Sequence, residues 1–95
     1  MIPYLIAPLA QADLEEIWRY VARDNPRAAD RLLAKFRDKF LLLAGQPEIG
    51  ERREDLRPNL RAFTAGKYVI YFRPGKDAIE VVRVLHSARN VRALF

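Results

Sequence analysis

Residues 60–85 read LRAFTAGKYVIYFRPGKDAIEVVRVL and contain three short runs that are rich in β-branched and aromatic residues. The runs cover residues 60–64, 68–73 and 79–85, and the gaps between them hold Ala65-Gly66 and Pro74-Gly75-Lys76-Asp77. Short gaps that contain glycine are typical of antiparallel hairpins. This stretch therefore predicts a three-stranded antiparallel meander.

The first half of the chain has a helical period instead. Apolar residues recur at helical spacing from Pro8 to Val21, and a stronger stripe follows Pro26. Asn25-Pro26 separates the two helices, because proline disfavours helix in the residue before it and asparagine can cap the next helix. Gly45 and Pro47 are expected to end the second helix. The pattern predicts an antiparallel helical hairpin with a very short turn. The second stripe consists of Ala29, Leu33, Phe36, Phe40 and Leu43.

The remaining segments are shorter. Residues 2–7 are apolar and predict a short first strand, residues 46–59 predict a polar loop, and residues 87–95 predict a short helix or an extended arm. The expected fold is α+β in a single domain over residues 1–95, with the order β-α-α-β-β-β. The helical hairpin would pack on one face of a small antiparallel sheet and leave the other face open.

The composition excludes several kinds of site. The chain has 95 residues, no cysteine and one histidine, His86. Disulfides and thiolate sites are therefore excluded, and zinc would lack the three or four ligands that it needs. We expect no metal and no cofactor. No apolar stretch approaches the roughly 20 residues of a membrane helix, and Met1 is not followed by a secretory leader pattern. The expected location is the cytoplasm, with no membrane partner.

The positive charge is concentrated in the second half of the chain. Residues 1–50 carry 7 Lys/Arg and 7 Asp/Glu, whereas residues 51–95 carry 10 and 5, which accounts for the net charge of +5. A local positive field favours anionic partners such as nucleic acid or an acidic peptide. Solvation of an ordinary surface is an equally good explanation for so small an excess.

The residues give little support for catalysis. Ser87 is the only serine and Thr64 is the only threonine of the chain. Ser87 is adjacent to His86, so a strand would direct the Ser87 and His86 side chains to opposite faces. Basic residues on an open sheet, with aromatic residues between them, could bind phosphates. The aromatic residues are more typical of a sheet core, and alternation places Arg83 and His86 on opposite faces unless a bulge intervenes. The pattern indicates a basic binding module.

Four stretches of the chain, taken in order, resemble the ParE branch of the RelE/ParE toxin superfamily, whose members are also described as plasmid stabilisation proteins. They are ADLEEIWRYVA at 12–22, NPRAA at 25–29, PEIG at 47–50 followed by LRAF at 60–63, and YVIYFR at 68–73 followed by VRVLHSARN at 82–90.

The resemblance implies a toxin that is neutralised by a ParD-like antitoxin. Such antitoxins have a ribbon-helix-helix part that binds operator DNA and a tail that wraps the toxin, so the toxin meets DNA only indirectly. ParE-like toxins resemble ribosome-dependent messenger-RNA endonucleases in fold but act on DNA gyrase, as inhibitors rather than enzymes. We therefore expect a gyrase inhibitor.

Two alternatives remain open. A RelE-type, metal-independent ribonuclease would use Arg61 and Arg83 as phosphate clamps and His86 as acid or base, although no tyrosine follows Tyr71 as it does in many such enzymes. A non-toxic co-repressor would only strengthen operator binding by the antitoxin. For contact with the target we expect Arg61, Arg83, His86, Arg89 and the C-terminal tail. For contact with the antitoxin we expect the outer grooves of the helices, at Leu14, Trp18, Phe36 and Phe40.

Overall fold

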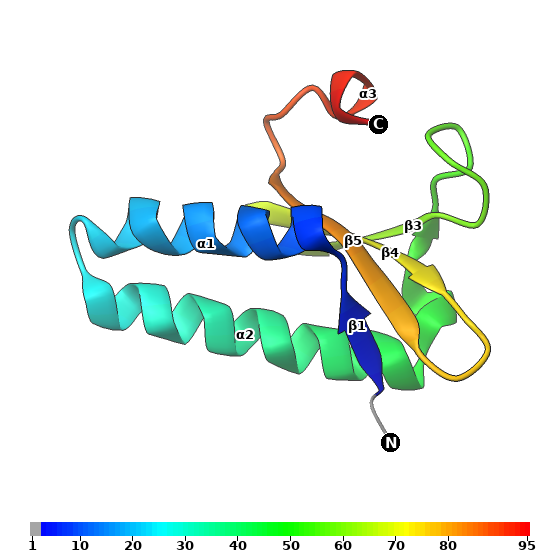
Figure 1. The fold of residues 1–95 in the computed structure, drawn as a ribbon, viewed down its shortest axis with the longest axis horizontal. Helices are drawn as coiled ribbons and strands as arrows, with labels where there is room; N and C mark the ends of the chain where they lie inside the picture. The colour runs from blue at the N-terminus through cyan, green and yellow to red at the C-terminus, as the bar shows by residue number, and fades with distance from the viewer. Residues whose placement is uncertain (1–2) are drawn as a thin grey trace.

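The computed structural model describes residues 3–95 (Figure 1). Two long helices run antiparallel on one side of a sheet, and the C-terminal segment crosses to the other side. In chain order the elements are β1 (Tyr4–Ile6), α1 (Pro8–Ala22), α2 (Pro26–Gly45), the 3₁₀ turn η1 (Pro47–Ile49), β2 (Glu51–Arg52), β3 (Arg61–Ala65), β4 (Tyr68–Pro74), β5 (Ile79–His86) and α3 (Val91–Leu94).

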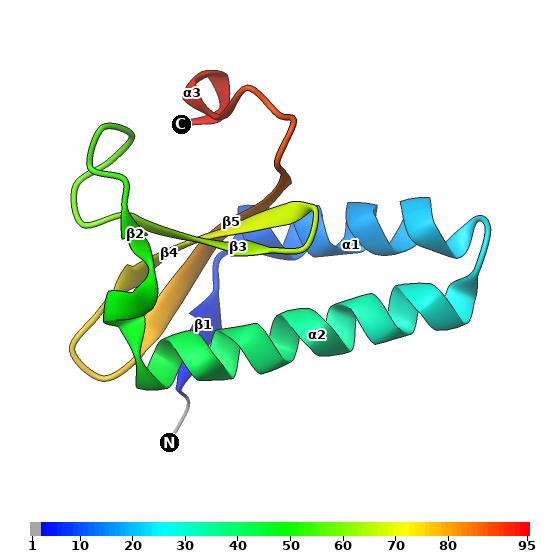
Figure 2. The ribbon, with the colours of Figure 1, turned by 180° about the vertical axis from the view of Figure 1, so that it is seen from behind.

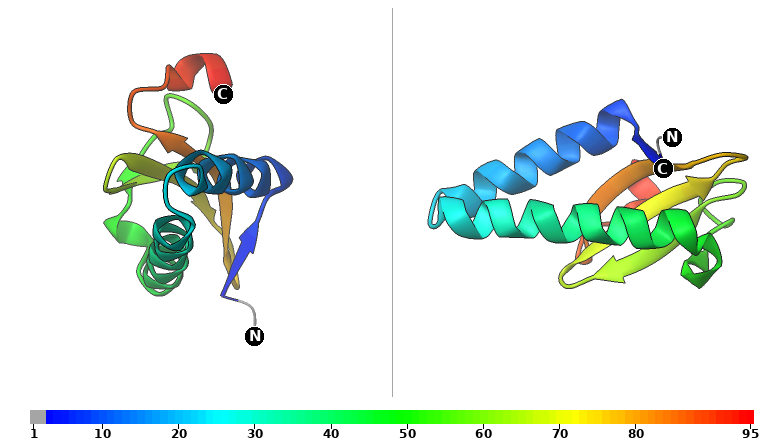
Figure 3. Two further views of the ribbon diagram at one scale, coloured as in Figure 1. Left: turned by 90° about the vertical axis from the view of Figure 1, so that its left-hand side faces the viewer. Right: turned by 90° about the horizontal axis from the view of Figure 1, so that it is seen from below.

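The helical hairpin is confirmed. Both helices begin at a proline, where the missing N–H costs nothing. The Asn25 side chain caps α2 by accepting a hydrogen bond of 3.1 Å from the amide of Ala28. The two helices lie close together at their connecting turn and diverge toward the sheet, as the right-hand view of Figure 3 shows.

The sheet contains the predicted antiparallel meander, but it is mixed rather than wholly antiparallel. Its strand order is β1-β5-β4-β3-β2, and β1 pairs parallel with β5 (Figure 2). The two helices follow β1 in the chain, and the meander comes after them. Its last strand, β5, lies beside β1 and pairs with it. The short strand β2 lies within the segment expected to be a loop and pairs antiparallel with β3. Ile2, which the sequence placed in the first strand, lies outside the described residues.

A turn and a bulge set the positions of the strand side chains. Gly66 follows β3 with a φ of +62°, a conformation that glycine adopts without steric cost. In the β4–β5 pair, Tyr71 lies opposite Arg83 and Phe72 lies opposite Val81. Val82 is therefore the extra residue of a bulge, which directs both Val82 and Arg83 away from the helix-covered face.

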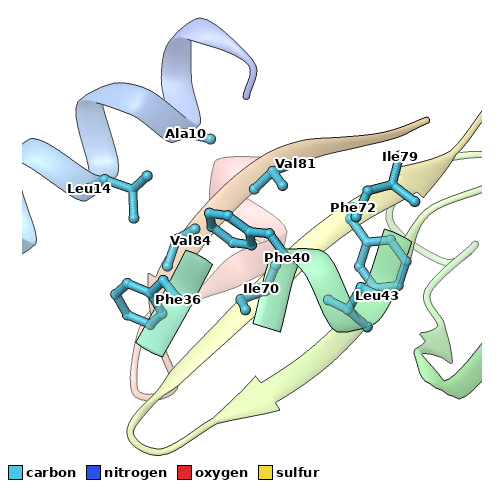
Figure 4. Packing of buried hydrophobic residues seen from close by; sticks show 10 residues of the cluster. All are labelled: Ala10, Leu14, Phe36, Phe40, Leu43, Ile70, Phe72, Ile79, Val81 and Val84. Carbon is cyan, nitrogen blue, oxygen red and sulfur yellow. The ribbon is translucent and has the colours of Figure 1, made fainter. Parts of the chain in front are cut away.

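The main core lies between the helices and the sheet (Figure 4). It combines apolar side chains from one stripe of each helix with alternate residues of the two central strands. Phe36, Phe40 and Phe72 are among the largest side chains that are fully buried. The members of this core are Ala10, Leu14, Phe36, Phe40, Leu43, Ile70, Phe72, Ile79, Val81 and Val84.

The second face of the sheet is covered, which corrects the expectation of an open face. The buried side chains of this face form a second cluster, and the C-terminal tail folds back over them. The ring of the C-terminal residue Phe95 packs against the ring of Tyr71, with centroids 5.1 Å apart. The tail has enough apolar residues to make its own contact with the sheet, which stabilises it by removing apolar surface from water. The cluster consists of Leu60, Ala62, Tyr71, Val82 and Leu85.

Candidate functional site

Arg83, one of the expected target-binding residues, forms a nearly buried ion pair. Its guanidinium donates from Nε to Asp13 Oδ2 at 2.8 Å and from Nη2 to Asp13 Oδ1 at 2.9 Å. Asp13 Oδ2 also accepts a bond of 3.0 Å from the backbone amide of Val84. The Arg83 side chain is 13% exposed and the Asp13 side chain is 10% exposed. The hydrogen bond to Asp13 raises the pKa of Arg83, against the opposing effect of burial.

This geometry gives Asp13 and Arg83 a structural role. The pairing of β1 with β5 ends at Val81, and within residues 3–95 no strand pairs with this edge of β5 beyond that point. Asp13 reaches this edge from α1 and satisfies the amide of Val84. Asp13 was not among the site residues expected from the sequence. A signal was available, because Asp13 lies three residues after Ala10 and one before Leu14, on the buried stripe of the helix.

Arg61 is also engaged within the fold. Its Nη1 donates to the carbonyl oxygen of Gly50 at 2.7 Å. Gly50 lies directly against the ring of Phe72, and a Cβ at this position would come within 2.5 Å of that ring and 3.2 Å of the Arg61 Cβ. Arg61 thus holds the segment after η1 against the end of the sheet.

His86 and Arg89 lie together, near the end of β5, and both are exposed. The His86 Nδ1 accepts a hydrogen bond of 3.1 Å from the amide of Ala88, which makes Nε2 the protonated nitrogen of the neutral ring. The ring packs edge-on against Tyr68, with centroids 5.5 Å apart. Of the expected target-binding residues, these two share one surface.

That surface is a groove of about 910 Å³. It lies between the second half of α1, the middle of α2, the β3–β4 turn and the residues that follow β5. We call it the basic groove, because its cationic side chains are Arg19, Arg23, Lys35, Lys39, Lys67 and Arg89. Arg61 and Arg83 are not among its lining residues.

The three residues expected for ribonuclease chemistry do not converge. Arg61 pairs with Phe72 and His86 pairs with Tyr68, both on the helix-covered side of the sheet but in different parts of it. Arg83 pairs with Tyr71 on the opposite face, as strand alternation predicts. A phosphate held by both arginines and reached by His86 would require Arg83 to leave Asp13 and turn to the other face of the sheet.

The residues expected to contact an antitoxin line a second, smaller groove of about 440 Å³ between the two helices and β1. Leu14, Phe36 and Phe40 are buried and form its floor. Trp18 is half-buried at its wall, and its Nε1 donates to Asp30 Oδ1 across the hairpin at 2.9 Å. The structure therefore brings these four residues together, and their contact with a partner stays a prediction.

The C-terminal tail is tied to the loop before β3. Asp55 accepts hydrogen bonds from Arg53 at 3.1 Å and from Arg92 of the tail at 3.1 Å. The guanidinium carbon of Arg57 lies 5.1 Å from the centre of the Phe95 ring, a cation–π distance. The bond to Arg53 lowers the pKa of the Asp55 carboxyl below its usual value of 3.8. Two contacts of different kinds thus hold the tail in place.

Among residues 3–95, no three histidine, aspartate or glutamate side chains lie close enough together to hold a metal ion. No helix in this range is long and apolar enough to span a bilayer.

Comparison with known proteins agrees with the fold. Residues 4–91 match the family described as ParE toxin of type II toxin-antitoxin system, parDE. Toxin ParE1 of Mycobacterium tuberculosis is 37% identical over 90 residues, which cover 93% of this chain and 92% of the relative. Toxin ParE1 of Caulobacter vibrioides is 34% identical over 95 residues, with 98% and 97% covered.

A solved structure described as a chromosomal ParDE TA system from P. aeruginosa has the same fold, with a TM-score of 0.73. It is 22% identical, and the match covers 90% of this chain and 96% of that one. The family match and the two relatives extend over nearly the whole chain. The chain therefore belongs to the ParE toxin family of type II toxin–antitoxin systems.

Proposed function

We propose that this chain is a growth inhibitor that binds DNA gyrase in the cytoplasm and is neutralised by a ParD-like ribbon-helix-helix antitoxin. The observation that carries the choice of a binding inhibitor over a nuclease is the engagement of both expected phosphate clamps within the fold. Arg83 is paired with Asp13, and Arg61 is bonded to the Gly50 carbonyl. The charge of Arg83 is neutralised by Asp13 and the Arg61 side chain is held by a hydrogen bond to the fold, whereas His86 and Arg89 are exposed.

The resemblance to ParE toxins and the family membership support the antitoxin partner. In this proposal, the antitoxin binds operator DNA and the toxin is brought to DNA only through it. The single domain over residues 1–95 acts as one binding unit without a cofactor.

The experiment is induction of the chain without its antitoxin, with cell shape, a DNA-damage reporter and bulk translation followed together. Filamentation and damage signalling with continuing translation are expected. Immediate translation arrest would favour the ribonuclease, and unaffected growth would leave the co-repressor role. A supercoiling assay with purified gyrase and purified toxin tests the target directly, and unchanged supercoiling at toxin excess would contradict it.

Variants in this assay need care, because Arg83→Ala removes a buried ion pair as well as a candidate contact. His86→Ala combined with Arg89→Ala removes two exposed side chains and is the informative pair. Arg27→Ala combined with Arg31→Ala is the matched control, since both residues are exposed on α2 and line neither groove. Loss of inhibition with the first pair and not with the second is the expected result.

A further inference from the structure

The basic groove unites parts of the chain that are distant in sequence. Its walls come from α1, α2, the β3–β4 turn and the segment after β5. The part of α1 that lines it runs from Asp13 to Arg23, about 15 Å of helix at the usual rise. Successive phosphates of one stacked nucleic-acid strand advance by about 3.4 Å along the axis. The length of the groove therefore matches about four nucleotides.

The charge of the groove is one-sided. Six cationic side chains line it, against two carboxylates, those of Asp13 and Glu16. The Asp13 carboxylate is already neutralised by Arg83. Over residues 3–95, Arg19 is the only one of the six cations within 4.0 Å of a carboxylate, and its contact with Glu15 is long at 3.9 Å. The groove thus retains a positive field that favours an anionic occupant.

The cations form rows along both helices. On α1, Arg19 and Arg23 are four residues apart, and on α2, Lys35 and Lys39 have the same spacing. Four residues advance a helix by about 6 Å, which is close to the advance of two nucleotides at about 3.4 Å each. The other two cations come from the β3–β4 turn and the segment after β5. A strand that lies along the groove can therefore place its phosphates against cations on both sides.

The groove also has an exposed aromatic ring, that of Tyr20. Tyr20 lies between Arg19 and Arg23 in the chain, lines the groove and is 70% exposed. The exposed His86 ring lines the groove from the end of β5, where it packs against Tyr68 with centroids 5.5 Å apart. Bases of any sequence stack on aromatic rings, and proteins that bind single strands combine such rings with a positively charged groove. The basic groove has both features.

We propose that the basic groove binds single-stranded nucleic acid, DNA or RNA, with about four phosphates on its cations and a base on Tyr20. The inference goes beyond the proposed function, because it assigns a further ligand to the chain and requires neither gyrase nor the antitoxin. It concerns binding and not cleavage, since Arg61 and Arg83 do not line the groove. Duplex DNA keeps its bases paired and stacked inside the helix, so operator DNA would still reach the toxin only through the antitoxin.

The charge test measures the binding of a labelled 12-nucleotide oligothymidylate to the purified chain by fluorescence anisotropy, at several salt concentrations. Lys35→Glu with Lys39→Glu alters the groove. Arg27→Glu with Arg31→Glu is the control with the same spacing and charge change, and both control residues are exposed on α2 and line neither groove. Circular dichroism verifies that all variants are folded.

Contact with about four phosphates predicts a slope of about −3 for log affinity against log salt concentration. We expect the groove pair to weaken binding by about tenfold or more and to make this slope shallower by about one unit. We expect the control pair to change the Kd by less than about threefold and to leave the slope unchanged. Equal effects of the two pairs would overturn the inference.

The stacking test compares two substitutions of Tyr20. Tyr20→Ala removes the ring, whereas Tyr20→Phe keeps it, and neither disturbs the core because the residue is 70% exposed. We expect Tyr20→Ala to weaken binding of the oligothymidylate by about 5- to 100-fold and Tyr20→Phe to weaken it by less than about twofold. Unchanged affinity in Tyr20→Ala would contradict the stacked base and overturn the inference.

The ligand test compares the oligothymidylate with an oligouridylate of the same length, a 12-base-pair duplex and a 12-residue oligoglutamate. Similar affinities for the two single strands would support recognition of their shared chemistry, and a tenfold preference would identify DNA or RNA as the source. Tighter binding of the duplex or of the oligoglutamate than of either strand would overturn the inference, and would assign the groove to duplex DNA or to an acidic protein segment. Failure of both strands to bind at low salt would also overturn it, while inhibition of gyrase in the supercoiling assay would still stand.

Discussion

Replacement of Asp13 by alanine should destabilise the protein far more than any other loss of a carboxylate on α1. The Asp13 carboxylate accepts three hydrogen bonds, two from Arg83 and one from the amide of Val84. Its removal leaves a guanidinium that is 13% exposed without its counter-charge, and it leaves the amide at the edge of β5 without its acceptor. Neither the Arg83 guanidinium nor the Val84 amide can be solvated without a rearrangement of the fold.

The magnitude follows from these two losses. Breaking a buried ion pair by removal of one partner costs about 3–5 kcal/mol, and an unsatisfied buried amide costs about 1–3 kcal/mol. The total is smaller than the sum of these two costs for two reasons. The ion pair is slightly accessible to water, and a single rearrangement of the structure around residue 13 can relieve both losses at once. We therefore expect Asp13→Ala to lower the free energy of unfolding by about 3–4 kcal/mol. A domain of this size has about 5–14 kcal/mol in total, so the loss is a large fraction of its stability.

The assay is urea unfolding followed by circular dichroism, with the free energy extrapolated to water. Glu15→Ala is the matched control, since Glu15 lies on the same helix, is 55% exposed and has only a long contact of 3.9 Å to Arg19. Its loss should change stability by less than about 0.5 kcal/mol. A loss below about 1 kcal/mol for Asp13→Ala, or equal losses for the two variants, would refute the assignment of the pair as a structural tie.

Two further predictions concern the packing of Gly50 on the sheet and the docking of the C-terminal tail. Gly50→Ala should lower the free energy of unfolding by about 1–3 kcal/mol, because its Cβ would come within 2.5 Å of the buried Phe72 ring. Gly45→Ala should be neutral or stabilising, since a Cβ there meets no atom within 4 Å, and similar urea midpoints for the two variants would contradict the close packing. The folded-state pKa of Asp55 is lowered, so its contribution to tail docking is present above the normal carboxyl pKa and is lost as the pH falls through the lower folded value. The NMR signals of the Phe95 ring should shift below about pH 4, and an Asp55→Asn variant that shows the same shift would contradict this origin.

The ion pair also changes how genetic results on this family member should be interpreted. Loss of toxicity in Arg83→Ala would be expected from reduced stability alone and would not distinguish a gyrase inhibitor from a ribonuclease. His86 and Arg89 are better probes, because they are exposed and the hydrogen bond at His86 is local. Measurement of the unfolding midpoint beside each toxicity assay separates the two causes.

The local pattern of the chain predicted the helices and the meander closely. The helix boundaries at Pro8, Pro26 and Gly45 depend on residues with strong local preferences, so the expected and observed elements agree. The three strand runs were within one residue of β3, β4 and β5. The two-residue strand β2 was missed because its charged residues have no strand pattern of their own, and they pair only because β3 lies beside them.

The composition and periodicity of this sequence determined the α+β class, the helical hairpin and the antiparallel meander, because these depend on contacts between residues that are near in the chain. The tertiary structure alone decided the parallel pairing of β1 and the return of the tail over the second sheet face. It also decided that Arg83 faces Asp13, 70 residues away in sequence. Such contacts depend on which surfaces remain to be buried once the local elements have packed. For the same reason, the basic residues that looked equivalent in sequence separate into two that are bonded within the fold, Arg61 and Arg83, and two that are exposed, His86 and Arg89.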